Sequence, residues 1–548
     1  MKCDAGWPAC NRCISTGRIC DGYGIWGGGG NAYQDRVKKP QIITLSKPTL
    51  QCMPISLGAA NFKPQGQGYL EWFFRRSVLK LPCIFGSSFW DTVILQASSG
   101  EQAILHATLA LGAAHKNEIF RKPGPRTKHD APDKHEQYAL NQYTMAISTL
   151  TPHLVAKNQE SFRITLITCL VFVCLEFLLG NWNTGFLHLQ KGLKLLEHYS
   201  SNSWRSNDLV DRAITDTFFD FHLQCQLFGI MGPSSFPRCA TFEIPANKFE
   251  SLIQSKEYLH LILEDALNIA QCCTHLSGSG QEPAFAELQR RQSRIRGQLT
   301  AWRRLLSNSL VQLQVHTNYK ASFSYKYLSI YHIMTKIILE TCLETRQESI
   351  FEKYTSDFIS LMAQLVDLLN SLVAAYKRKP RLAGEGDSPF GSSVGMGWIP
   401  PLYFTAIKCR QHRLRIHAIR LLTMNFHKEG VWDSQLAGSI AHEVMEVEEG
   451  DYYKDFDVDD SFPLSVAPCA ENLTLPVLPL AYRVHRLEVQ LPSEYQDKVK
   501  LACWRRKEDG SWVSIAKEFD VWRDGVPTQR SDQYQNMSRC YEFMSIEP

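Results

Sequence analysis

Apolar residues recur at helical spacing through most of the chain, in segments separated by glycine- and proline-rich breaks. Within 138–150, for example, Leu140, Tyr143, Ile147 and Leu150 follow at intervals of three, four and three, on one face of a helix. The same period predicts helices over 101–116, 186–196, 213–230, 258–273, 284–313, 325–344, 351–376, 402–426 and 434–449. Strand signals are few: 499–504 and 511–515 flank a turn and predict one hairpin. The sequence therefore predicts an all-α fold, a large bundle of stacked antiparallel helices.

The most apolar stretch, 164–179, is sixteen residues long and includes Thr165, Thr168 and Glu176. A membrane-spanning helix needs about 20 apolar residues, and a carboxylate inside it is costly. We therefore predict that this stretch is a buried core helix, and we expect no membrane partner.

Positive charge is concentrated at the start of the chain. Hydrophobic residues make up 44% and charged residues 21% of the chain, which excludes a mostly disordered protein, a collagen-like fibre and a coiled-coil rod. The formal net charge is only +4, and residues 1–50 carry seven Lys and Arg against three Asp. The rest of the chain therefore sums to zero, and a surface for nucleic acid is expected only near the beginning.

Four of the seventeen cysteines fall within the first twenty residues, in the pattern Cys3-x6-Cys10-x2-Cys13-x6-Cys20. Zn²⁺ prefers four thiolates in a tetrahedron, and the two-residue spacing lets two of them bind one ion from a single turn. So short a segment has no room for a hydrophobic core, so metal would supply its folding energy. The alternative is a disulfide framework; we expect reduced thiols instead, because 1–30 has no apolar secretory core.

This segment resembles the second half of the fungal Zn2Cys6 binuclear cluster domain, with its four cysteines at the family's third to sixth positions. Neighbouring residues also match the family: Lys2, Asp4, Pro8 and 21–23. The resemblance implies two zinc ions in a complete cluster. Cys10 would bridge both, Cys3 would bind one of them, and Cys13 and Cys20 would bind the other.

The first two cysteines of the family pattern, and most of the basic stretch after them, have no counterpart in the chain. With four thiolates, the chain as given is expected to hold at most one zinc ion. In the family the basic stretch reads a CGG triplet in the major groove, and only Lys2 of it is present. We expect Met1 to be an internal methionine, with the missing cysteines encoded upstream.

The resemblance makes double-stranded DNA the expected partner. The candidate DNA contacts are six cations of the cluster and the linker: Lys2, Arg12, Arg18, Arg36, Lys38 and Lys39. Linker residues in the family add phosphate contacts, a role that suits flexible cations. The alternative for Arg36, Lys38 and Lys39 is that they are solvated residues of a linker without contacts to DNA, and it explains their presence equally well. The family often dimerises through heptads after the linker, but 21–67 shows no clear heptads, so a homodimer stays open.

Most of 69–450 resembles the fungal-specific transcription factor domain, an all-α regulatory region with no established catalytic role. The likeness depends on the order of several segments: 69–80, 103–115, 141–150, 183–196 and 408–424, followed by 429–433. The expected organisation is a small, incomplete zinc cluster (1–23), a flexible glycine- and proline-rich linker (24–67) and a helical regulatory domain (68–548).

Two predicted helices carry dense charge. In 402–426 the charged or titratable residues are Arg410, His412, Arg413, Arg415, His417 and Arg420; 434–449 ends with Glu446, Glu448 and Glu449. We interpret both as solvated faces, with a ligand-sensing or partner face as the alternative for the first. The sequence contains no P-loop, and we expect that the protein is not an enzyme.

The leading hypothesis is a nuclear, zinc-dependent transcription regulator that binds DNA through the cluster and is controlled by the helical domain. A small-molecule effector or transcriptional co-regulators are further candidate partners. The basic run 377–381 is either a nuclear import signal or the basic end of a helix. The alternative function is a helical regulatory or scaffold protein that has lost DNA binding with the first two cysteines.

Overall fold

The computed structural model describes residues 64–81, 84–120, 133–156, 158–200, 208–232, 245, 247–275, 282–344, 347–378, 391–492, 498–507 and 509–521. These residues are mostly helical, which confirms the predicted all-α fold. The cysteine cluster and nearly all of the predicted linker lie outside the described residues. The proposed division at 23 and 67 therefore stays a prediction.

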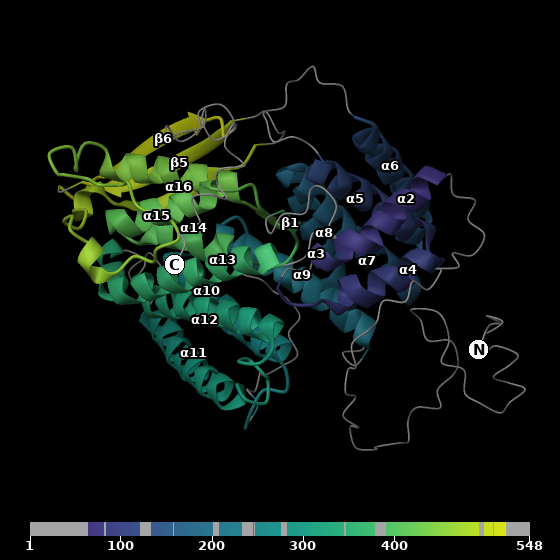
Figure 1. Ribbon diagram of the computed structural model, residues 1–548, viewed down its shortest axis with the longest axis horizontal. Helices are drawn as coiled ribbons and strands as arrows, with labels where there is room; N and C mark the ends of the chain where they lie inside the picture. Colours follow the sequence, from purple (N-terminus) through teal and green to yellow (C-terminus); the bar gives the residue numbers. More distant parts are fainter. Residues whose placement is uncertain are drawn as a thin grey trace, which may run out of the picture.

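The first half of the described chain forms the right side of Figure 1. It begins with short helical pieces: α2 (Pro64–Trp72), η1 (Phe73–Ser77), α3 (Val78–Lys80), η2 (Phe89–Val93) and α4 (Ile94–Gly100). Five long helices follow: α5 (Gln102–Phe120), α6 (Lys134–Val155), α7 (Gln159–Leu179), α8 (Trp182–Ser200) and α9 (Leu209–Phe228). The helix α5 packs against both α6 and α7, and α7 packs in turn against α8.

The helix α7 is the core helix expected from its composition. Most of its residues are buried, including Glu176, whose carboxylate accepts hydrogen bonds from Tyr143 Oη at 2.7 Å and Asn181 Nδ2 at 2.8 Å. By length and composition, α7 and Glu348–Arg378 would each suffice to cross a membrane. In α7, 83% of the apolar window is buried inside the protein, as expected for a core helix. It ends at Gly180, whose φ of 83° favours glycine.

The second half of the described chain forms the left side of Figure 1. Its helical elements are α10 (Leu252–His275), α11 (Glu282–Ser309), α12 (Tyr319–Thr341), η3 (Glu348–Tyr354), α13 (Thr355–Arg378), α14 (Ile399–Lys408), α15 (His412–Thr423) and α16 (Ser434–Glu449). The helices α10, α11 and α12 pack together, and α14, α15 and α16 form a second group joined to them through α13. The predicted single helix over 402–426 is wrong, because Cys409 and Gln411 are extended and separate α14 from α15.

A three-stranded antiparallel sheet follows, beside α16 in Figure 1. Its strands are β4 (Val484–Gln490), β5 (Val499–Arg506) and β6 (Trp512–Phe519), in that order, preceded by the single turns η4 (Ala470–Asn472) and η5 (Leu480–Tyr482). The pair β5–β6 is the predicted hairpin, which is confirmed. The strand β4 was not predicted, although its side chains alternate between more and less buried positions.

The two halves are joined by two short segments from the second half. These segments contain β1 (Ser392–Ser393), parallel to β2 (Lys428–Glu429), which is antiparallel to β3 (Trp432–Asp433). The buried side chain of Gln224 on α9 donates to the carbonyl of Val394 at 3.0 Å and accepts from the amide of Val431 at 3.2 Å. At Gly430, where φ is 58°, a Cβ would lie 2.2 Å from Gln224 Oε1. The junction therefore requires glycine there.

Candidate regulatory site

The predicted metal ligands Cys3, Cys10, Cys13 and Cys20 all lie outside the described residues, as do the six candidate DNA contacts. The zinc and DNA assignments therefore stay predictions. Within the described ranges, no group of three or more His, Cys, Asp or Glu residues is placed to hold a metal ion.

The charged helix α15 does not present the solvated face expected from its sequence. Arg410, Arg415 and His417 are at most 4% exposed, and His412 is 9% exposed. The acidic end of α16 is buried as well, at Glu448 and Glu449, whereas Glu446 is exposed. Both interpretations as solvated faces are wrong for these residues, because the two helices pack against each other. Arg410, His412 and Arg415 pair with the buried carboxylates, and His417 bonds the carbonyl of Leu464.

Arg415 lies at the centre of this buried ion network. Its Nη2 is 2.6 Å from Glu448 Oε2, and its Nη1 donates to Glu449 Oε1 at 3.1 Å. Its Nε donates to the carbonyl of Ala406 at 3.0 Å. Burial works against the guanidinium charge, but the two carboxylates outweigh it and hold the pKa of Arg415 above its ordinary value. A fully buried cation is thus matched by two carboxylates of the neighbouring helix.

The break between α14 and α15 brings Arg410 into the same network. Arg410 Nη2 lies 2.9 Å from both Glu348 Oε2 on η3 and Glu448 Oε1 on α16. Lys408 Nζ binds the other oxygen of Glu348 at 3.0 Å. Burial favours the neutral acid, yet Lys408 and Arg410 prevail and lower the pKa of Glu348. The break therefore directs the side chain of Arg410 into the network, whereas a continuous helix would place it elsewhere.

His412 extends the network toward solvent. Its Nδ1 lies 2.6 Å from Glu449 Oε2, and its Nε2 lies 3.2 Å from Asp460 Oδ1. Burial would lower the pKa of His412, but its hydrogen bonds to Asp460 and Glu449 prevail and raise it to about 9. His412 is therefore an imidazolium at neutral pH and donates from both ring nitrogens.

We expect His412 to make the free energy of unfolding decrease as the pH rises from neutral to alkaline. Its pKa is raised by folding, so its contribution is fully present below the unfolded-state value near 6.5 and is lost as pH rises to about 9. The loss amounts to at most about 3 kcal/mol of unfolding free energy. Urea titrations between pH 6 and 9.5 should show this decrease in the wild-type chain and a smaller one in His412→Asn. The exposed His316→Asn is the control and should keep the wild-type slope; equal slopes in all three would contradict the assignment.

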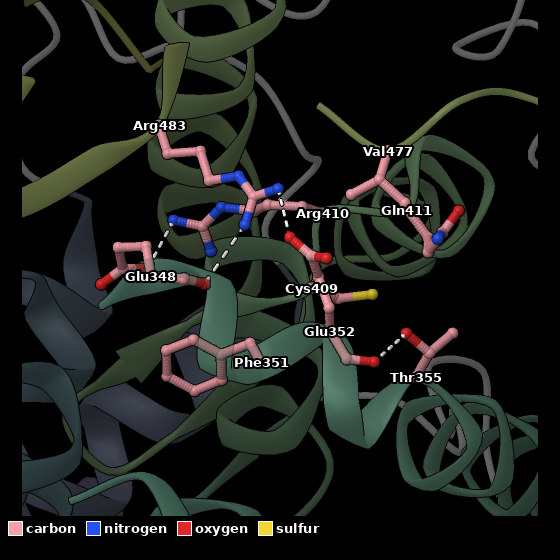
Figure 2. Close-up of a pocket in the computed structure, with 9 residues that line it drawn as sticks. All are labelled: Glu348, Phe351, Glu352, Thr355, Cys409, Arg410, Gln411, Val477 and Arg483. Atoms are coloured by element: carbon pink, nitrogen blue, oxygen red, sulfur yellow. Dashed lines mark hydrogen bonds and ion pairs between the residues drawn. The ribbon is translucent and has the colours of Figure 1, made fainter. Parts of the chain in front are cut away.

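Figure 2 shows a small cavity beside the network, with Arg410 and Arg483 directed toward the side chains of Glu348 and Glu352. Arg483 is 2% exposed; its Nη2 lies 2.5 Å from Glu352 Oε1, and its Nε donates to the carbonyl of Leu478 at 2.8 Å. The space measures about 10 Å³, which is room for one water. The arrangement holds η3, α15, α16 and the start of β4 together by paired charges.

A second polar feature fixes the start of α14. The carboxylate of Glu429 on β2 is fully buried and accepts the backbone amides of Gly397 and Trp398, each at 2.8 Å, and of Ile399 at 3.2 Å. His427 Nδ1 accepts from the amide of Gly391 at 3.2 Å, so its Nε2 carries the proton and donates to Glu429 at 3.1 Å. Glu429 thereby satisfies the amides at the start of a helix whose second and third residues are prolines.

A larger cavity lies at the junction of the two halves. Residues 85–87, Trp90 and α9 line it from one side, and α10, α12 and 394–396 from the other; its volume, measured in the same way as that of the first cavity, is about 40 Å³. Asp220 binds Lys256 Nζ at 3.0 Å and His260 Nδ1 at 3.2 Å. Burial opposes the charge of Asp220, but these partners hold its pKa well below the ordinary value. The cavity thus combines ionised groups with aromatic walls.

The sequence profile of the fungal specific transcription factor domain matches residues 69–424. The chain belongs to this family. The match covers α5 to α15 and includes Arg410, Arg415 and Glu348, whereas Glu429, Glu448 and Glu449 follow its end.

Two known proteins that are similar to this chain are named as transcription regulators. The aspercryptin biosynthesis cluster-specific transcription regulator atnN of Emericella nidulans is 23% identical over 540 residues, which cover 82% of this chain and 85% of the relative. The transcription regulator lscL of Purpureocillium lilacinum is 25% identical over 204 residues, or 36% of this chain and 47% of the relative. No solved structure matches the chain.

Proposed function

We propose that this family member is a nuclear, zinc-dependent regulator of transcription by RNA polymerase II that binds CGG-type DNA sites through its N-terminal cysteine segment. The observation that carries the proposal is the order of parts: a Cys3-x6-Cys10-x2-Cys13-x6-Cys20 segment precedes the family domain at 69–424. Because one relative is named for a biosynthesis cluster, we further propose that the targets are the genes of one biosynthetic cluster.

Zinc fits the donor set of this segment. Four thiolates satisfy the tetrahedral preference of one Zn²⁺, and two ions bridged by Cys10 would need six. Zinc would supply the fold of the segment and thereby place Lys2, Arg12 and Arg18 against the phosphates of DNA. The linker cations Arg36, Lys38 and Lys39 would add phosphate contacts from the flexible chain that follows. Each phosphate contact releases counterions, so affinity should fall steeply with salt.

Zinc content and DNA affinity test the proposal together. We expect the chain extended by its upstream reading frame to carry two zinc ions and to bind a CGG duplex, and a chelator or Cys10→Ser to abolish binding. Cys469→Ser is the matched control, because Cys469 is an exposed cysteine outside the cluster. Zinc content would be measured by mass spectrometry of the native protein and affinity by fluorescence anisotropy at two salt concentrations.

The alternative function, a helical regulatory or scaffold protein without DNA binding, predicts a different result. An upstream frame that encodes no C-x2-C followed by basic residues, together with one zinc ion or none, would support this alternative. CGG affinity that is unaffected by the chelator would contradict the zinc-dependent mechanism.

The helical domain would set the activity of the regulator. We propose the junction cavity as the place where a small-molecule effector binds, because its walls come from both halves of the domain. A ligand there that favours one arrangement of α9 against α10 would change how the halves are held together. Co-regulators would then respond to that change.

A further inference from the structure

The helix α6 carries an unusual concentration of exposed apolar side chains. Five large ones lie on it: Leu140, Met145, Ile147, Leu154 and Val155, which are 52%, 45%, 47%, 63% and 77% exposed. Single exposed apolar residues are normal on soluble proteins, whereas a contiguous group marks an interaction surface. The opposite face of α6 buries Ala139, Ala146 and Leu150 against the body of the protein, so the exposed group has a fixed orientation.

The exposed face of α6 is also uncharged. No Asp, Glu, Lys or Arg occurs between Gln137 and Ala156. Its hydroxyl groups are satisfied within the helix: Thr144 donates to the carbonyl of Leu140 and Thr151 to that of Ile147, both at 3.0 Å. Because these donors already have partners, burying the face would leave them satisfied. The exposed face of α11, by contrast, carries ion pairs such as Arg290–Glu287.

Five residues form one stripe along this face, which we call the α6 stripe: Leu140, Thr144, Ile147, Thr151 and Leu154. Their intervals are four, three, four and three, the mean spacing of 3.5 residues at which two helices pack along a seam. The stripe also has the same order of residue types, Leu-Thr-Ile-Thr-Leu, in both directions along the helix. A surface of this kind is complementary to a second copy of itself.

We propose that the α6 stripe is a dimerisation surface and that its occupant is the α6 stripe of a second copy of this chain. The two helices lie antiparallel across a two-fold axis at Ile147, so that Leu140 of one copy faces Leu154 of the other. The absence of charge supports this occupant, because identical surfaces with charged centres would place like charges together. The stripe spans about 21 Å of helix.

A dimer of ordinary stability buries roughly 800 Å² on each partner, more than the stripe alone provides. Neighbouring surface must therefore contribute. The helix α8 approaches α6 where His188 Nε2 lies 3.0 Å from Tyr143 Oη, and it carries a further exposed apolar side chain, Leu187, at 52%. In Figure 1, α6 lies at the outer edge of the first half. The proposal does not depend on DNA binding.

Sedimentation equilibrium of the full chain tests the proposal. We expect a monomer–dimer equilibrium whose dissociation constant rises by about a hundredfold in Ile147→Glu, because two carboxylates would face each other at the axis. Val311→Glu is the control: Val311 is 88% exposed on the turn after α11, and its substitution should leave the equilibrium unchanged. A monomeric wild-type chain at tens of micromolar, or a dimer that Ile147→Glu does not weaken, would overturn the proposal.

Cross-linking with a short bis-maleimide tests the antiparallel geometry. Ile147→Cys should cross-link to itself, above the baseline set by the native cysteines of the wild-type chain. Leu140→Cys alone should stay at the baseline, because its two copies would lie about 21 Å apart. A mixture of Leu140→Cys and Leu154→Cys chains should cross-link. If Leu140→Cys cross-links to itself while the mixture does not, the antiparallel arrangement is wrong.

Discussion

An Arg415→Met chain should lose about 3–5 kcal/mol of unfolding free energy, the largest loss that we expect from a single substitution in the buried network. Methionine fills much of the volume of arginine but leaves Glu448 and Glu449, both nearly or fully buried, without the cation between them. The penalty comes mainly from these two buried carboxylates, which would keep only Arg410 and His412 as cationic partners. Urea denaturation at pH 7, followed by the far-ultraviolet circular dichroism of the helices, measures it.

Two further chains separate this cause from a general loss of packing. Arg290→Met removes an exposed arginine paired with Glu287 at 3.2 Å and should cost less than about 1 kcal/mol. The double variant Arg415→Met/Glu448→Met also removes one of the two carboxylates that Arg415 binds. It should recover part of the unfolding free energy that Arg415→Met loses. If the double variant is as unstable as the sum of its single variants, the loss is not due to unpaired charge.

A Glu429→Gln chain should lose about 2–4 kcal/mol, although glutamine has nearly the same shape. Both carboxylate oxygens of Glu429 accept backbone amides at the start of α14. Glutamine keeps one acceptor and puts an NH₂ donor where the other oxygen was, so donors would face donors in a fully buried place. The same urea titration measures the loss.

The control is Glu488→Gln, because Glu488 is an exposed glutamate on β4 paired with Arg486. It should change stability by less than about 1 kcal/mol. Since β2 lies at the junction, Glu429→Gln should also increase amide exchange in 391–397 before the rest of the molecule opens. Unchanged protection there, with unchanged stability, would contradict the capping role.

The helical period was enough to predict most of the long helices and the all-α class. The apolar residues that predicted α5 and α8 from their period, such as Ile104 and Leu189, face a single core, and that preference is local to each segment. The period failed at 402–426, where the chain is extended at Cys409 and Arg410 binds Glu348, a residue about 60 positions away. The short strand β4 was missed for a similar reason: it exists only through its pairing with β5.

The charged residues of α15 show how the site could have been found. Arg415 precedes Ala418, Ile419 and Leu422 by three, four and seven positions, so it lies within the apolar stripe of its own helix. A cation in that position predicts a buried partner, but not which carboxylate provides it. Glu429 gave no such signal, because a glutamate in a turn is ordinarily solvated.

The partners of α15 also determine where this domain can be cut. The family match ends at residue 424, yet the carboxylates that neutralise Arg410 and Arg415 come partly from Glu448 and Glu449, and the amide of Val484 binds Glu448 at 2.7 Å. A fragment ending at Met424 would retain both arginines and lose these acceptors. Because β4 pairs with β5 and β5 with β6, the smallest piece worth expressing runs at least through Phe519, which adds nearly one hundred residues to the recognised domain.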